Sequence, residues 1–240
     1  MKRVPGLKRV LVTGASGGIG GEFRKFCRGR YEVVSFDRRP VPDDPGAMVG
    51  DLTDLAALTA AAKGCAAMVH LAAIRDDADF MTEILPNNIT GCFNAFEAAR
   101  RAGVGKVVFA STDQVNSGYP HGEFISTDMP ARPTNYYAVS KLFGEDVGRI
   151  YSASFGMSVI CLRIGWGAVP ADWEWVEEIE KRGPPKSALS LRDMNEIMAR
   201  AVDVEGVGFE ILPAFSRNAA GARDLSSLKR VLDYEPQDEL

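Results

Sequence analysis

The sequence predicts an α/β fold, a doubly wound parallel sheet with helices on both faces. Up to about residue 165, short apolar runs rich in β-branched residues alternate with longer amphipathic patterns, as the strands and helices of a parallel sheet do. A glycine-rich turn links the first such strand to the first helix. Polar side chains stand where a central strand ends, and doubly wound sheets bind their ligands at these carboxyl ends.

Composition narrows the class of protein. The chain has 240 residues, of which 46% are hydrophobic and 25% charged, and its net charge is −4. This is an ordinary globular profile without a basic footprint for nucleic acid or an anionic membrane. No apolar run approaches the roughly 20 residues that span a bilayer. Widely spaced cysteines without a C-x-x-C pair predict buried thiols in a cytoplasmic protein, not a disulfide framework or zinc site; they are Cys27, Cys65, Cys92 and Cys161.

The N-terminal pattern predicts a nucleotide site. Residues 9–13 form an apolar strand, and the glycine-rich turn over 14–20 leads into a helix. Such a turn lets backbone amides approach a pyrophosphate at the helix N-terminus, although it can also be only a tight turn. A second strand over 31–36 ends in Asp37, placed about 20 residues on to accept hydrogen bonds from both ribose hydroxyls. This carboxylate would repel a 2′-phosphate, which favours NAD over NADP, and Arg38 and Arg39 would soften that preference.

The next elements continue the alternation. Residues 48–51 predict a third strand, and Thr53 is a plausible N-cap for a helix over 54–63. Residues 67–73 predict a fourth strand, in which His70 is expected to be a packed core residue and not a ligand. A long amphipathic helix over 83–101 follows.

A fifth strand over 106–111 ends in Ser111 and Thr112, which either cap the strand or face a ligand. After a loop, a helix over 135–155 carries Tyr137 and Lys141 on one face. An ammonium group near a phenol lowers the phenol pKa, so the pair can move a proton to or from a hydroxyl. The alternative is an exposed lysine beside a half-buried tyrosine.

Beyond a sixth strand over 158–163 the pattern loosens. Trp166, Trp173 and Trp175, with nearby prolines, indicate loops and a short helix over the carboxyl edge of the sheet. A helix over 190–203, a strand over 209–213 and a helix over 224–232 complete the chain. Residues 1–165 are therefore expected to form the dinucleotide-binding core, and 166–240 a short substrate lid packed on the same domain.

With these motifs in order, residues 8–167 resemble the extended short-chain dehydrogenases/reductases of the NAD-dependent epimerase/dehydratase superfamily, which have a Rossmann core. The carrying positions are residues 13–20, Asp37, Asp51 with Leu52, residues 70–73, Asn88 with Gly91, Ser111 with Thr112, Tyr137 and Lys141. Within the superfamily the chain is most similar to the uronate dehydrogenase group, through residues 109–112, 130–133, 137–145, 163–165 and 232–237.

The resemblance implies roles residue by residue. Tyr137 would be the general base, Lys141 would lower its pKa and hold the nicotinamide ribose, and Thr112 would donate to the substrate oxygen. The implied cofactor positions are Gly14, Ser16, Gly17, Gly18, Ile19, Asp37, Arg38, Asp51, Leu52, Leu71, Ala72, Ala73, Ile74, Asn88, Tyr137, Lys141 and Ile164. The implied substrate positions are Arg75, Thr112, Asp113, Gln114 and Trp166.

The implied activity is NAD-dependent oxidation of a hydroxyl of a monosaccharide or sugar acid. The short C-terminal segment favours a small free sugar over a nucleotide sugar. Asp113 and Gln114 stand where the uronate dehydrogenase group has Asn-His, and a carboxylate there would repel a sugar acid, so a neutral aldose stays open. The expected arginine for a substrate carboxylate is not matched, because residues 184–186 occupy its place.

Other readings also remain open. One is a nucleotide-sugar epimerase or dehydratase with tightly bound NAD, and another is a nucleotide sensor without turnover. The resemblance also points to a homodimer through the helices over 83–101 and 135–155.

Overall fold

The computed structural model describes residues 6–41, 43–75, 78–120, 122–169, 188–218 and 222–240, with only the backbone of 167–169. Trp173, Trp175 and the prolines around them, for which loops and a short helix were expected, lie outside these ranges.

A seven-stranded sheet runs through the molecule in the order β3-β2-β1-β4-β5-β6-β9, and every neighbouring pair is parallel. The order reverses between β1 and β4, which creates a crevice at the carboxyl ends of these strands. The doubly wound fold is thus confirmed. The strands are β1 (Lys8–Thr13), β2 (Tyr31–Asp37), β3 (Met48–Val49), β4 (Ala67–His70), β5 (Lys106–Thr112), β6 (Ser158–Ile164) and β9 (Phe209–Ala214).

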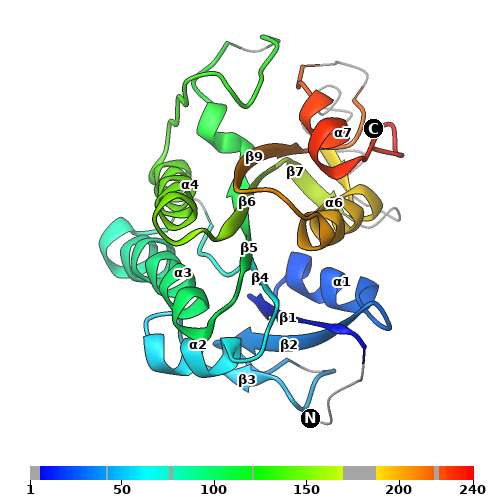
Figure 1. Ribbon diagram of the computed structural model, residues 1–240. Helices are drawn as coiled ribbons and strands as arrows, with labels where there is room; N and C mark the ends of the chain where they lie inside the picture. Colours follow the sequence, from blue (N-terminus) through cyan, green and yellow to red (C-terminus); the bar gives the residue numbers. More distant parts are fainter. Residues whose placement is uncertain (1–5, 42, 76–77, 121, 170–187, 219–221) are drawn as a thin grey trace.

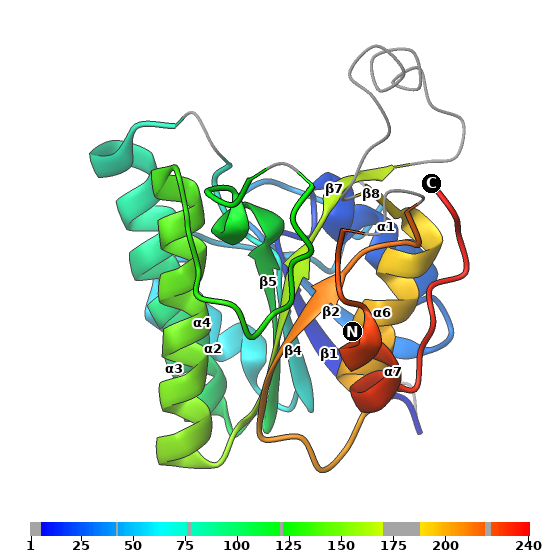
Figure 2. The same ribbon diagram turned by 90° about the horizontal axis from the view of Figure 1, so that it is seen from above.

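Helices cover both faces of this sheet (Figure 1), and the view from above separates the same two layers (Figure 2). On one face lie α2 (Leu55–Ala62), α3 (Gly91–Ala102) and α4 (Tyr136–Phe155). On the other lie α1 (Gly18–Phe26) and α6 (Leu191–Asp203), with α7 (Ser226–Leu232) beside α6. Successive strand residues supply opposite faces: Val10 and Val12 belong to the core under α1 and α6, and Leu11 to the core under α2 and α3.

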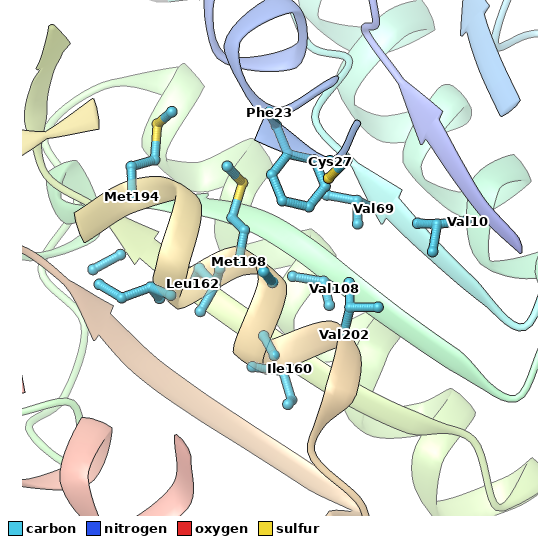
Figure 3. Close-up of a cluster of buried hydrophobic side chains, with 14 of the residues drawn as sticks. Val10, Phe23, Cys27, Val69, Val108, Ile160, Leu162, Met194, Met198 and Val202 are labelled. Atoms are coloured by element: carbon cyan, nitrogen blue, oxygen red, sulfur yellow. The ribbon is translucent and has the colours of Figure 1, made fainter. Parts of the chain in front are cut away.

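The C-terminal segment shares its core with the N-terminal part. Met194, Met198 and Val202 recur along α6 at a spacing of four residues, which places them on one helical face. Figure 3 shows this face lying over β5 and β6, where it meets Val108 and Ile160. Because β9 also pairs with β6, the residues after 187 complete the sheet and the helical layer that carry the site.

Several predicted element boundaries were wrong. The helix α2 is capped by Asp54, whose carboxylate accepts from the Ala57 N–H; Thr53 instead donates its N–H and hydroxyl to Asp51. The fourth strand ends at His70, not at residue 73. Trp166 begins a strand, β7 (Trp166–Val169), which pairs with β8 (Ala188–Ser190) where loops were expected.

The long helix predicted over 83–101 begins earlier and in another geometry. A π-helix, η1 (Phe80–Thr90), precedes α3, and the Asp79 carboxylate caps it by accepting from the Thr82 N–H. Pro86 lies inside η1 and has no N–H to donate, so regular α-helical hydrogen bonding is interrupted there. The apolar pattern of the sequence predicted one continuous helix through this proline, so the change of helix type was not predicted.

The predicted core residues are where they were expected. All four cysteines are buried and free, and His70 is only 2% exposed. Burial lowers the pKa of His70 to about 3, so the ring is neutral at physiological pH; its Nδ1 hydrogen-bonds the Thr13 hydroxyl at 2.7 Å. Among the described helices, none is long and apolar enough to cross a membrane.

Candidate active site

The glycine-rich turn between β1 and α1 has two positions that admit no side chain. Gly14 has φ +71°, and a Cβ there would lie 2.7 Å from the Ala72 nitrogen; a Cβ on Gly20 would lie 2.2 Å from the Gly14 oxygen. At Gly18, where α1 begins, a Cβ would meet no heavy atom within 4 Å. The fold therefore requires glycine at positions 14 and 20, whereas Gly18 leaves the helix N-terminus open to a ligand.

A groove opens at the crevice between β1 and β4 and runs along the ends of β2 and β3. The predicted cofactor residues that line it are Gly14, Gly17, Asp37, Arg38, Asp51, Leu52, Leu71, Ala72, Ala73 and Ile74. Phe36, Gly50 and Asn87 line it as well and were not assigned to it from the sequence. Arg39, which was expected to affect the choice between NAD and NADP, also lines it. Residues from five separate segments thus share one concavity at the position where this sheet topology binds nucleotides.

Asp37 is fixed in this groove by the backbone. Its side chain is 7% exposed; Oδ2 accepts from the Ser16 N–H and Oδ1 from the Arg39 N–H, both at 2.9 Å. The carboxylate cannot turn away from the groove without losing both bonds. Asp51 is oriented in the same way by Thr53, and these hydrogen bonds hold the Asp51 pKa below its usual range.

Asn88 shapes one wall of the groove. Its Oδ1 accepts from the Ile74 N–H at 2.8 Å, and its Nδ2 donates to the Ile74 carbonyl at 2.9 Å and to Ser140 Oγ at 3.0 Å. The side chain is 4% exposed. Asn88 therefore clamps the segment after β4 to α4, which carries Tyr137 and Lys141.

Thr112 ends β5 and is oriented by the turn that follows it. Its Oγ1 accepts from the Gln114 N–H at 3.3 Å, at the start of the 3₁₀ turn η2 (Asp113–Asn116). A hydroxyl that accepts from the backbone keeps its own proton to donate. Thr112 thus caps the strand and keeps a hydroxyl proton to donate; that this hydroxyl faces a ligand stays a prediction.

Lys141 lies against Tyr137 in the interior. Its Nζ is 5.6 Å from the centre of the Tyr137 ring and 5.2 Å from that of Phe109, and the residue is 4% exposed. Burial lowers the Lys141 pKa to about 8, so the amine is still mostly charged at pH 7. The alternative of an exposed lysine is wrong, and a buried cation next to a phenol favours the phenolate.

A hydrogen bond links the two halves of the site. Asn135 caps α4 by accepting from the Ala138 N–H at 2.7 Å, and its Nδ2 donates to Gln114 Oε1 at 2.7 Å. The turn after Thr112 is thereby tied to the first turn of α4, where Tyr137 lies. Gln114, which was predicted to face the substrate, therefore also holds these two segments together. The only sequence feature that pointed to Asn135 was its position at the start of the helix, where asparagine is a common N-cap.

Asp113 is paired with an arginine from the far end of the chain. Arg223 donates from Nε to Oδ1 at 2.9 Å and from Nη2 to Oδ2 at 2.7 Å, and both side chains are less than one-fifth exposed. The negative charge expected to repel a sugar acid is therefore balanced. Nothing near Arg223 in the sequence indicated this contact. Arg75 is exposed and Trp166 is 44% exposed, and their roles toward a substrate stay predictions.

Comparisons with known proteins agree with this arrangement. The family model "NAD dependent epimerase/dehydratase family" matches residues 10–166. A uronate dehydrogenase from Pseudomonas syringae pv. tomato is 33% identical over 96% of this chain and 82% of its own length. An L-arabinose 1-dehydrogenase (NAD(P)(+)) from Haloferax volcanii is 30% identical over 97% of both chains.

Solved structures of uronate dehydrogenases are also similar to this chain. A crystal structure of a uronate dehydrogenase variant from Agrobacterium tumefaciens, complexed with NAD, superposes with a TM-score of 0.85 at 32% identity, and the match covers 97% of this chain and 85% of that one. Together with the groove and the buried Lys141 beside the half-buried Tyr137, these matches show that the chain belongs to the NAD-dependent epimerase/dehydratase family.

Proposed function

We propose that the protein is an NAD-dependent dehydrogenase that oxidises a hydroxyl-bearing carbon of a monosaccharide or sugar acid, with Thr112, Tyr137 and Lys141 as its catalytic residues. The observation that carries the proposal is Lys141, a cation 4% exposed whose Nζ lies 5.6 Å from the Tyr137 ring centre. Burying a charge is costly, and activation of the neighbouring Tyr137 phenol is a function that accounts for a buried charge on Lys141.

The residues present fit NAD. The open amide end of α1 at Gly18 suits a pyrophosphate, and the fixed Asp37 carboxylate suits ribose hydroxyls. Asp51 and Leu52 would border the adenine, and Lys141 would hold the nicotinamide ribose. When bound, NAD supplies the acceptor for a hydride from the sugar carbon.

The protein's own groups would handle the proton. The Lys141 charge lowers the free energy of the Tyr137 phenolate relative to the phenol. The phenolate takes the proton of the substrate hydroxyl as general base, and the Thr112 hydroxyl donates to the same substrate oxygen, which holds it in place. The bond from Asn135 to Gln114 ties the turn after Thr112 to the helix that carries Tyr137.

The names of the relatives support a sugar or sugar acid as the substrate, since one is a uronate dehydrogenase and another an L-arabinose 1-dehydrogenase. The Asp113–Arg223 pair carries no net charge, so it admits both a neutral aldose and a sugar acid.

A screen of free sugars and uronic acids with NAD tests the proposal, with NADH read at the nicotinamide absorbance band. We expect stoichiometric NADH with at least one of them. An epimerase or dehydratase that recycles its NAD would accumulate none, so turnover of a nucleotide sugar without NADH would replace this proposal with the recycling activity.

We also propose a homodimer in the cytoplasm. α3 and α4 expose large apolar side chains, namely Phe93, Val139, Ile150 and Phe155. Light scattering checks the prediction, and a monomer mass at micromolar concentration would contradict it.

A further inference from the structure

Asp193, near the start of α6, carries a carboxylate that is completely buried. Its Oδ1 accepts from the Tyr234 hydroxyl at 2.5 Å and from the Gln237 N–H at 2.7 Å. Its Oδ2 accepts from the Ser216 hydroxyl at 2.5 Å and from the Asp238 N–H at 3.1 Å. A buried charge is costly unless it is hydrogen-bonded, and these four uncharged donors meet that need. The chemistry proposed above makes no use of this group.

The four donors come from two segments that lie apart in the sequence. Ser216 follows β9, and residues 234–238 follow α7. The second segment is also held by Ser190, whose hydroxyl donates to the Asp238 carboxylate at 2.5 Å. Figure 2 shows the chain after α7 running along α6. Asp193 thus joins α6 to the chain after β9 and to the chain after α7.

The same contacts fix β8, which directly precedes α6. The Ser190 N–H donates to Ser216 Oγ at 2.9 Å, and the Ser216 N–H donates to the Ala188 carbonyl at 3.0 Å. The Asn218 side chain adds two bonds to Ala188, one from its N–H and one to its carbonyl. Ser216 is therefore the joint between the Asp193 carboxylate and the strand β8.

From β8 the contacts continue to the carboxyl ends of the central strands. Ala188 pairs with Trp166, the first residue of β7. β7 begins two residues after Ile164, the last residue of β6, and Ile164 pairs in register with Thr112. Trp166 is therefore close in the chain to the strand end that lies beside the predicted catalytic hydroxyl. A displacement of β8 would change the position of Trp166.

We propose that Asp193 is a positioning residue for the sugar side of the site, where it holds Trp166 in place through Ser216 and β8. The inference rests on the proposed function through Trp166, whose contact with a sugar is a prediction. When a donor to Asp193 is lost, β7 and β8 hold the sugar-binding arrangement for only part of the time. The apparent affinity for the sugar falls by that fraction. The groove predicted for NAD is lined by residues up to Asn87 and keeps its shape.

Tyr234→Phe tests the inference, because it removes one of the four donors and adds no group. We expect the KM for the free sugar or uronic acid that gives most NADH to rise about tenfold, since a hydrogen bond to a buried carboxylate is lost. The kcat and the affinity for NADH should change less than about twofold. The three tryptophans of the chain, Trp166, Trp173 and Trp175, all follow β6 and precede β8. Acrylamide should therefore quench the tryptophan emission more strongly in the variant, with no sugar present.

Tyr31→Phe is the matched control. Tyr31 is also buried, and its hydroxyl donates at 2.7 Å to the carboxylate of Asp203, the last residue of α6. Both variants should lower the free energy of unfolding, but Tyr31→Phe should leave the KM and the tryptophan quenching unchanged. Ser216→Ala removes the joint itself and should reproduce the effects of Tyr234→Phe.

The positioning role would be overturned, with the proposed function left standing, by either of two results. One is an unchanged KM and unchanged quenching in Tyr234→Phe and Ser216→Ala. The other is an equal rise of the KM in Tyr31→Phe, which would show a general effect of lower stability. If the wild-type protein forms no NADH with any free sugar or uronic acid, the proposed function fails, and the quenching alone decides whether Asp193 anchors β7.

Discussion

Glu145 and Arg163 form a buried ion pair that links α4, the helix that carries Tyr137 and Lys141, to β6. Arg163 Nε donates to Glu145 Oε1 at 3.0 Å and Nη2 to Oε2 at 2.9 Å, with side chains 5% and 3% exposed. Ser111 Oγ also donates to Glu145 Oε1 at 2.6 Å. Glu145 lies on α4 one turn after Lys141, and Ser111 precedes Thr112 on β5 and pairs in register with Arg163 on β6. One carboxylate thus joins the three elements that position the site.

Glu145→Gln should lower both stability and kcat. Removing the charge leaves the Arg163 cation buried without compensation, which costs about 3 to 5 kcal/mol. NAD binding should change little, because no Glu145 contact faces the groove.

The double variant Glu145→Leu with Arg163→Met serves as control. It should recover stability, since an apolar pair of similar volume avoids the buried charge, and yet keep a low kcat because α4 is no longer tied to Ser111. Chemical denaturation and steady-state kinetics check both quantities; full recovery of kcat in the double variant would show that the network only stabilises the fold.

Lys141→Met should abolish turnover and stabilise the cofactor-free protein at pH 7. The Lys141 pKa falls from 10.5 to about 8 on folding, and at about 1.4 kcal/mol per unit this corresponds to a cost on the order of 3 kcal/mol for burying the charge. Below pH 8 both states hold the proton and the full cost is present.

As pH rises from 8 toward 10.5, the folded state releases the proton before the unfolded state does, so the cost shrinks. The stabilisation by Lys141→Met should therefore fade over this range. Thermal melting of both proteins across pH measures it, and a variant that melts below the wild-type protein at pH 7 would refute the prediction.

Arg223→Ala should penalise an acidic substrate more than a neutral one. Asp113, next to Thr112, then keeps its negative charge without the bidentate partner. At an effective dielectric constant near 20, a like charge several ångströms away costs on the order of 1 to 2 kcal/mol, about a tenfold loss. The ratio of kcat/KM for a uronic acid and its matching neutral aldose reports the effect. Asp113→Asn added to Arg223→Ala should restore the ratio; no restoration would mean that Asp113 does not face the substrate.

Asp37→Ala should weaken NAD more than NADP. The variant removes the acceptor for the ribose hydroxyls but leaves the Arg39 guanidinium in place. Binding titrations with the two nucleotides measure the change in preference. An unchanged preference would mean that the ribose does not meet Asp37.

The sequence was most informative where function depends on local spacing. Strand and helix periodicity predicted the parallel sheet, and the positions after β1, β2 and β4 predicted most of the groove lining. Glu145 also left a signal, four residues after Lys141 on the same helical face. Contacts between residues far apart in the sequence left no such signal. Asp113 and Arg223, for example, are 110 residues apart. The pairing of β7 with β8 likewise depends on tertiary packing and not on local pattern, whereas Pro86 was itself a local signal that regular α-helical hydrogen bonding is interrupted.

Tyr137→Phe tests the central claim most directly, because it removes one oxygen and leaves the ring against Lys141. The account predicts that NADH formation with the best sugar or sugar acid falls by at least about a thousandfold, as expected when a general base is lost, while NAD binding stays within about threefold of the wild-type value. Near-normal NADH formation by Tyr137→Phe would contradict it.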